Sequence, residues 1–425
     1  MVLKNKIKSE YVCSFCSKRN LELIMDFGEM ALAGAFLKPE HFKAEKKFPM
    51  RVCFCKNCFA VQIIDIIPPN TLFKDYFYFS SSIKTLRDHF ISYANDLTER
   101  FLNPSVATVL EFGCNDGVLL NPLADLGIKN VIGVDPAENV VSTINNSRIK
   151  IFNDYFTEKV AEEVKARFGP VDLIMANNVY AHIPDIQLTT RAVKNLLSDE
   201  GLFVFEVHYL GKVVEEMQYD MIYHEHLYYY SLISAIEHFK NYEMVIFDVK
   251  HVPIHAGSLR FYVAKKGSNL ASNISKSVKK LEIEERKKGY NKFLNFQLFS
   301  EKVESTKNNL ITLLKKIKKE NKIIAGYGAS GRANTIIQYC GITSDLVSYM
   351  IDDAPAKIGF FTPGSHLEVL PSSILNSPNR PDYVLVFAWS FFEEILDRNK
   401  QYINSGGRMI LPLPEVRILD SKSLN

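Results

Sequence analysis

The segment Tyr223-His224-Glu225-His226 gathers the side chains best suited to chemistry in this sequence. Two imidazoles, a carboxylate and a phenol on one short segment suit proton transfer, because an imidazole titrates near neutral pH. The histidines lie two positions apart and not four, so the segment does not match the HExxH motif of zinc proteases. We expect a functional role for the cluster as a whole, although a structural role is the commoner outcome for any single histidine.

Two cysteine pairs near the N-terminus have the spacing of metal ligands. Cys13 and Cys16 form one CxxC pair, and Cys55 and Cys58 form the second, with Cys53 two residues before it. Two such pairs are typical of a structural zinc site, in which four thiolates leave no open position for catalysis. We therefore predict structural zinc, an insertion over residues 17–54, and Cys53 as a reserve ligand. Buried free thiols are the alternative.

The elements that must position these groups follow from the apolar pattern. Strands are expected at 107–113, 130–135, 171–178 and 201–207, and crossover helices at 117–128 and 137–145. Such alternation indicates an α/β fold with a parallel sheet. A helical connector is expected over 66–104, surface helices over 275–322, and a second α/β unit after residue 322. The chain thus holds two Rossmann-like units in series.

The first α/β unit carries a glycine loop, Glu111 to Gly117, directly after its first strand. Gly113 and Gly117 allow close approach of a ligand, and Asp135 ends the next strand, where an acid can accept ribose hydroxyls. The loop lacks the GxGxxG spacing that suits a pyrophosphate, and an acid followed by GxxxG fits S-adenosylmethionine. Asn115 in the loop and Asn177 at a later strand end complete the predicted cofactor site.

The second loop, Gly326 to Gly331, does match GxGxxG, and Asp352 and Asp353 follow at the spacing of a dinucleotide fingerprint. A nicotinamide site is one interpretation. The others are a tight turn whose nucleotide site has been lost, and a loop whose amides, with Arg332, hold substrate phosphates.

Composition excludes several classes of protein. The net charge of the 425 residues is +3, which argues against a dedicated nucleic-acid binder. No apolar run is long enough for a membrane span, and the N-terminus lacks the apolar core of a secretory signal. We therefore expect a cytoplasmic protein without membrane or nucleic-acid partners.

These motifs, in this order, resemble the sugar C-methyltransferases of deoxysugar biosynthesis. The resemblance covers nearly the whole chain and rests on the paired cysteines and on the strings YFYFSSS, EFGCNDG, ANNVYAHIPD, YHEHLYYYS, HAGSLR, GYGASGRANTIIQYCGI and TPGSH. It implies transfer of methyl from S-adenosylmethionine to C3 of a nucleotide-linked 4-keto-6-deoxy sugar. It also implies a zinc-binding domain (1–68), a methyltransferase domain with a helical lead-in (69–265), a helical connector (266–322) and a C-terminal Rossmann-like domain on the sugar-nucleotide side (323–425).

The resemblance also assigns roles to residues. It implies His226 as the base, with Tyr223, Glu225 and His182 in the active site, together with a tyrosine of the YFYF string, where Tyr76 and Tyr78 stay open. We expect five substrate-binding residues: His224, Arg260, Ser330, Arg332 and Asn334. His208 stands where relatives often have proline, and the ASGRANT stretch varies among them, which leaves the sugar and the nucleotide open.

Three hypotheses follow. The sugar C-methyltransferase, a monomer or weak homo-oligomer, leads. The second is a nicotinamide-dependent sugar-nucleotide oxidoreductase that uses the GYGASG loop. The third, a non-catalytic module stabilised by zinc, is disfavoured by the histidine cluster.

Overall fold

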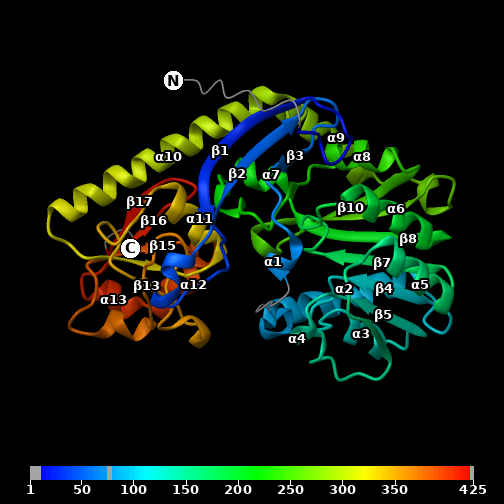
Figure 1. Cartoon of the computed structure of the whole chain (residues 1–425), viewed down its shortest axis with the longest axis horizontal. Helices are drawn as coiled ribbons and strands as arrows, with labels where there is room; N and C mark the ends of the chain where they lie inside the picture. The colour runs from blue at the N-terminus through cyan, green and yellow to red at the C-terminus, as the bar shows by residue number, and fades with distance from the viewer. Residues whose placement is uncertain (1–10, 74–78, 422–425) are drawn as a thin grey trace.

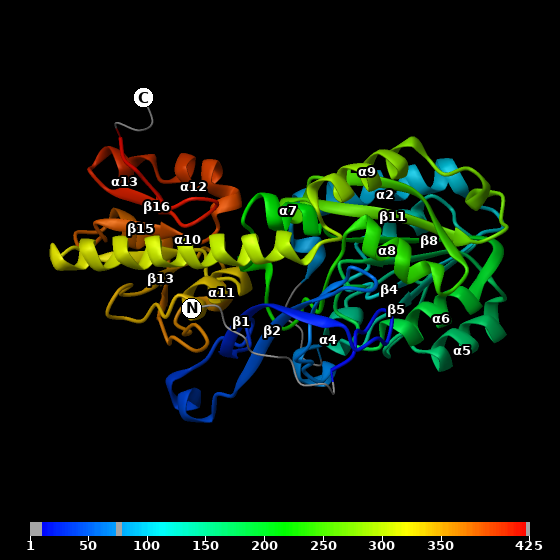
Figure 2. The same cartoon turned by 90° about the horizontal axis from the view of Figure 1, so that it is seen from above.

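A computed structural model describes residues 11–73 and 79–421. Two lobes, each built on its own sheet, lie side by side (Figures 1 and 2). The hairpin of strands β1 (Leu21–Ala31) and β2 (Lys47–Cys55) lies between them, and helix α10 (Phe293–Lys319) runs along one side of the molecule. None of the helices in the described part of the chain is both long and apolar enough to cross a membrane.

The N-terminal sheet is antiparallel and joins segments that are far apart in the sequence. Its order is β1-β2-β3-β9, with β1 at Leu21–Ala31, β2 at Lys47–Cys55, β3 at Val61–Ile63 and β9 at Tyr228–Tyr229. The hairpin β1–β2 occupies most of the stretch 17–54 that the sequence predicts as an insertion. Strand β9 comes from the string that follows His226, so the sheet crosses the boundary expected at residue 68.

The central sheet has seven strands in the order β10-β11-β8-β7-β4-β5-β6. Strands β4 to β8 are parallel where they pair, and β11 is antiparallel to both β8 and β10. The strands span Thr108–Phe112 (β4), Asn130–Val134 (β5), Ile149–Phe152 (β6), Val171–Asn177 (β7), Leu197–His208 (β8), Met244–Val252 (β10) and Ser258–Lys265 (β11). The four strands predicted from the apolar pattern are therefore confirmed. All five residues of β4 are buried, as expected for a strand covered on both faces.

Helices connect and cover these strands. They are α1 (Pro69–Phe73), α2 (Lys84–Phe101), α3 (Leu120–Asp125), α4 (Glu138–Val141), α5 (Glu158–Phe168), α6 (Ile186–Leu196), α7 (Leu210–Glu215) and α8 (Leu232–Lys240). The order of the sheet reverses at β4, which has β5 on one side and β7 on the other. In open α/β sheets ligands bind at such a reversal, beyond the carboxyl ends of the strands.

The C-terminal lobe repeats the parallel plan on a smaller scale. Its sheet has the order β14-β13-β12-β15-β16-β17, in which β17 is antiparallel to its neighbour. The strands are β12 (Ile324–Tyr327), β13 (Met350–Ile351), β14 (Val369–Leu370), β15 (Tyr383–Val386), β16 (Arg408–Leu411) and β17 (Arg417–Leu419), with helices α11 (Gly331–Tyr339), α12 (Phe392–Arg398) and α13 (Lys400–Asn404). Helices α9 (Lys276–Lys288) and α10 fill the stretch 275–322, where surface helices were predicted.

Candidate active site

One large cavity collects most of the predicted site residues. Its volume is about 1490 Å³, and its lining comes from α2, from the carboxyl ends of the central strands, from the segment around His226 and from the C-terminal lobe. Single-ligand pockets usually measure roughly 300–1,000 Å³. The cavity is therefore large enough for two ligands side by side.

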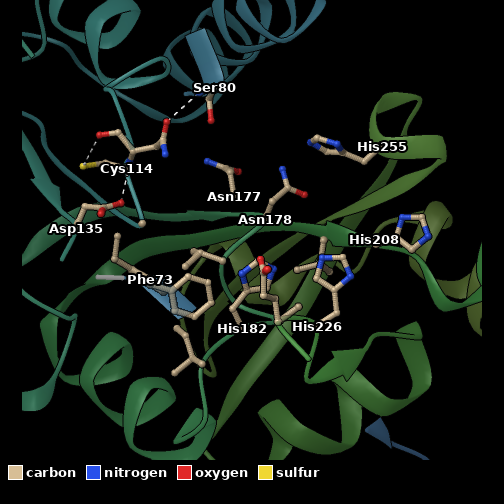
Figure 3. A pocket seen from close by; sticks show the side chains of 18 of the residues that line it. Phe73, Ser80, Cys114, Asp135, Asn177, Asn178, His182, His208, His226 and His255 are labelled. Atoms are coloured by element: carbon tan, nitrogen blue, oxygen red, sulfur yellow. Dashed lines mark hydrogen bonds between the residues drawn. The ribbon is translucent and has the colours of Figure 1, made fainter. Parts of the chain in front are cut away.

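The glycine loop after β4 forms one end of the cavity (Figure 3). Gly113 has a φ of +66°, and a Cβ there would lie 2.6 Å from a side-chain carbon of Val179, so only glycine fits. Asp135 accepts hydrogen bonds from the amides of Asn115 (2.9 Å) and Ala137 (2.9 Å), and burial raises the pKa of its carboxyl. Gly117, at φ +74°, closes the turn but does not line the cavity.

Glu111 and Asn177 meet at the reversal of the sheet. The Asn177 amide donates to Oε1 of Glu111 at 2.8 Å, while Oε2 of Glu111 is buried without a partner. Burial raises the pKa of Glu111 to about 8. A buried carboxyl with a free oxygen at the cavity wall fits a cationic ligand, because a nearby positive charge favours ionisation. With the close approach allowed at Gly113, these residues fit S-adenosylmethionine.

His226 lies at the centre of the cavity wall in a defined tautomer. Its Nδ1–H donates to the carbonyl oxygen of Met221 at 2.7 Å, which leaves the lone pair on Nε2. The ring centroids of Tyr223 and His182 lie 4.0 Å and 5.1 Å from that of His226. Burial lowers the pKa of His226 to about 4, so the imidazole is neutral at pH 7.

Burial also shifts the neighbours of His226 toward their neutral forms. Burial raises the pKa of Glu225 to about 7. Burial, and then His226, lower the pKa of His182 well below its usual value, and the ring of His182 stacks near Phe73 at 5.8 Å. Glu225 and His182 both line the cavity. The partner that orients the His226 ring is the backbone of Met221 and not the adjacent carboxylate.

The C-terminal loop supplies the opposite wall. Ser330 caps α11 by accepting from the amide of Ala333, and both Ser330 and Arg332 line the cavity. The Arg332 guanidinium donates to Oδ2 of Asp220 at 2.9 Å, and the Trp389 indole donates to the same oxygen at 2.9 Å. Arg332 is thus held in place at the cavity wall.

Three predicted substrate-binding residues do not line the cavity. His224 is buried, and its Nε2 donates to the carbonyl of Pro49 at 3.1 Å. The side-chain amide of Asn334 donates to the carbonyl of Ala33 at 2.5 Å. Arg260 is buried and binds Oε2 of Glu206 through two nitrogens at 2.8 Å and 2.9 Å. These side chains make structural contacts in the packed interior, so the structure does not bring them to the cavity as expected. Tyr76 and Tyr78 lie outside the described residues.

The cavity also contains residues that the sequence did not mark as site residues. His89 on α2 lies 3.1 Å from Oε1 of Glu206, and His255 follows β10 with a φ of +51°. Lys357 lines the C-terminal wall and donates to the carbonyl of Ala329 at 2.7 Å. His208, where relatives often have proline, is also in the lining, and burial lowers its pKa to about 3. No motif in the sequence distinguishes these residues from the many polar residues that lie outside the cavity.

The four predicted zinc ligands come together away from the cavity. The sulfurs of Cys13, Cys16, Cys55 and Cys58 lie within 4.8 Å of one another, and the Cys13–Cys58 and Cys16–Cys55 distances are 3.5 Å and 3.6 Å. Sulfurs about 2.3 Å from a tetrahedral zinc ion would be roughly 3.8 Å apart, so the set fits zinc. Cys53 is buried outside this group, so the four predicted ligands form the set without the reserve ligand.

Comparison with known proteins agrees with this arrangement. Residues 13–73 match a family of zinc binding domains, residues 86–246 a methyltransferase domain, and residues 253–414 the C-methyltransferase C-terminal domain. The chain is 30% identical to C-methyltransferase NovU of Streptomyces niveus over 412 residues, which cover 97% of both chains. The chain belongs to the sugar C-methyltransferase family. It is therefore an S-adenosylmethionine-dependent C-methyltransferase with a zinc-binding N-terminal region, as the sequence predicts.

Two similar solved structures each cover less than half of this chain. Magnesium protoporphyrin IX methyltransferase of Synechocystis PCC 6803, with bound SAH, is 15% identical over 42% of this chain and 82% of its own, with a TM-score of 0.33. An S-adenosylmethionine-dependent methyltransferase of Clostridium acetobutylicum ATCC 824 is 13% identical over 44% and 94%, with a TM-score of 0.31.

Proposed function

We propose that this C-methyltransferase acts at C3 of a nucleotide-linked 4-keto-6-deoxy sugar, with His226 as the base. The observation that carries the proposal is the anchored imidazole of His226. Its Nδ1–H is held by the carbonyl of Met221, and the resulting tautomer places the lone pair on Nε2. A low pKa keeps this nitrogen free of a proton at neutral pH.

The proposed reaction begins with proton abstraction beside a ketone. A C4 carbonyl acidifies the C3 hydrogen, and Nε2 of His226 accepts that proton while negative charge moves to the C4 oxygen. Tyr223 and His182 are next to His226, and either can donate a hydrogen bond to the developing oxyanion. Such a donor typically contributes roughly 3 kcal/mol to stabilising the transition state. S-adenosylmethionine, when bound, supplies the electrophilic methyl group that C3 accepts.

The two ends of the cavity suit two different ligands in this proposal. Gly113, Glu111 and Asp135 hold the donor, which carries positive charge on its sulfonium and its amino group. Ser330 and Arg332, at the start of α11, face the sugar-nucleotide, whose phosphates are attracted to a helix N-terminus and a guanidinium. Alignment of the two ligands in one cavity provides the entropic advantage of a unimolecular reaction.

The test is incubation of the purified protein with S-adenosylmethionine and a panel of nucleotide-linked sugars. The panel contains 4-keto-6-deoxy sugars and the matching 4-hydroxy sugars, and mass spectrometry follows the gain of one CH2 group. Methylation only of the 4-keto members, with the new carbon at C3 by NMR, is the expected result. Methylation of the 4-hydroxy members would contradict the proposed mechanism, and a new carbon elsewhere on the ring would contradict the proposed position.

A further inference from the structure

The zinc-binding region pairs directly with the segment that carries His226. Strand β9 begins two residues after His226, and its Tyr228 lies opposite Gln62 of β3. The amide of Ile63 donates to the carbonyl of Leu227 at 2.8 Å, which extends the pairing toward His226. The backbone that follows the proposed base is therefore a strand of the N-terminal sheet.

Gln62 connects this pairing to the metal site. Its side chain is buried, its Nε2 lies 3.1 Å from Sγ of Cys13, and its Oε1 accepts from the amide of Ser14 at 2.9 Å. Both ends of the amide are thus satisfied by the loop that holds the first cysteine pair. Because a buried polar group left without partners is costly, the position of β3 depends on the position of this loop.

The same loop also contacts the segment that carries His182. Gln187, at the start of α6, donates to the carbonyl of Ser14 at 2.9 Å and to the hydroxyl of Ser17 at 2.8 Å. The Tyr228 hydroxyl donates to the carbonyl of Pro184 at 2.8 Å. The cysteine loop therefore touches the segment that carries His182, and Tyr228 ties that segment to the one that carries His226.

Further backbone contacts join the two segments to each other. The amide of Leu227 donates to the carbonyl of Ala181 at 2.9 Å, directly beside His182. Phe15, between the first two cysteines, packs against Tyr228 and Tyr230 with ring centroids 5.2 Å and 5.4 Å apart. Displacement of the cysteine loop would therefore move both segments.

We infer that the zinc-loaded Cys13–Cys16 loop, acting through Gln62 as a positioning residue, sets the placement of His226 and His182 for proton abstraction. This inference rests on the proposed function for the role of the histidines, but the coupling of the loop to the two segments does not. Binding of zinc stabilises the local fold and so fixes the position of the Cys13–Cys16 loop. The loop in turn fixes the position of the paired strands β3 and β9. A displacement of about 1 Å in an active site can cost roughly 100-fold in rate.

The test compares Gln62→Met with Asn20→Ala. Methionine has nearly the shape of glutamine but cannot make either hydrogen bond of Gln62. Asn20 also lies in the zinc-binding region, where its side-chain amide donates to the side chain of Asn57 at 3.2 Å on the surface. Four quantities are measured for each variant: zinc content, affinity for S-adenosylmethionine, amide hydrogen exchange, and the pH dependence of kcat/KM.

For Gln62→Met we expect retained zinc, unchanged donor affinity, and faster amide exchange in residues 223–230 and 179–187. We expect kcat to fall about 10- to 100-fold, with a smaller change in KM. The acid limb of kcat/KM should move upward from about pH 4, because a loosened segment admits water around His226. A variant that is merely less stable would lose active enzyme without moving this limb. Asn20→Ala should match the wild type in all four measurements.

Unchanged amide exchange in Gln62→Met, with zinc retained, would overturn the inference. If Gln62→Met loses zinc, Gln187→Leu gives the same test from the other side of the loop, with local exchange near 179–187 as its readout. Normal exchange and normal kcat in Gln187→Leu would then overturn it. A wild-type protein that methylates no sugar of the panel would contradict the proposed function alone, because the exchange measurements need no substrate.

Discussion

Replacement of His226 by asparagine separates proton abstraction from every other step. The side-chain amide of asparagine can reproduce the Nδ1–H bond to Met221, which is 2.7 Å long in the wild type. It has no counterpart of Nε2. His226→Asn should therefore keep the local backbone and the donor site, while it removes the atom that accepts the proton.

The size of the effect follows from the state of the imidazole. With a pKa of about 4, roughly one His226 side chain in a thousand is protonated at pH 7. Nearly every molecule therefore has an unprotonated His226 at pH 7, so the variant should lose the full contribution of the base to the rate. Removal of a general base costs about 100- to 10,000-fold in rate, or roughly 3–5 kcal/mol of barrier. Between pH 7 and pH 5 the wild type should lose at most about a tenth of its activity from protonation of this imidazole.

The assay follows hydrogen exchange at C3 of the 4-keto sugar in D2O, with S-adenosylhomocysteine in place of the donor. Wild-type protein should exchange this hydrogen without methyl transfer, and His226→Asn should abolish both exchange and turnover. His224→Asn is the matched control, because His224 lies two residues away and contacts Pro49 outside the cavity. Exchange at the wild-type rate in His226→Asn would show that another residue is the base, and Tyr223 would be the first candidate.

Three further outcomes are expected. We expect metal analysis of the wild type to give one equivalent of zinc and Cys16→Ser to lose it, and full zinc in this variant would contradict the four-cysteine site. Asp135→Ala should weaken donor binding by about 1–3 kcal/mol in calorimetry, and unchanged affinity would remove this residue from the donor site. Donor affinity should rise with pH by up to about tenfold per unit until pH 8, because the cation binds ionised Glu111, whose pKa is about 8 in the free protein. Glu111→Gln should remove that dependence, and a retained slope would assign it to another group.

Local patterns were sufficient to predict the zinc ligands and the parallel strands. Each CxxC pair forms within one turn, so spacing alone brings its two sulfurs together. Buried parallel strands are continuous apolar runs, which is why 107–113 and 171–178 were recognisable. The pairing of β9 with β3 could not be predicted, because it joins residues more than 160 positions apart and involves only two residues of β9.

Which side chains face the cavity was harder to predict than which segments do. Tyr223 to His226 form a turn in which the amide of His226 donates to the carbonyl of Tyr223 at 2.9 Å. This turn places the first and last side chains together and directs His224 away. The four residues include no glycine, proline or asparagine to signal a turn. The role of Arg260 was also hard to predict from sequence. Its partner Glu206 lies opposite it on the neighbouring strand, and the sequence alone does not show which strands pair.

Burial moves several titratable groups of the cavity toward their neutral forms. The pKa values of His226 and His208 fall to about 4 and 3, while those of Glu225 and Glu111 rise to about 7 and 8. A base with so low a pKa would be weak in water, but negative charge next to an imidazole raises its pKa. In the proposed reaction that charge develops on the sugar as the proton leaves. The low pKa of the free protein keeps His226 unprotonated beforehand, and the reaction itself then strengthens it as a base.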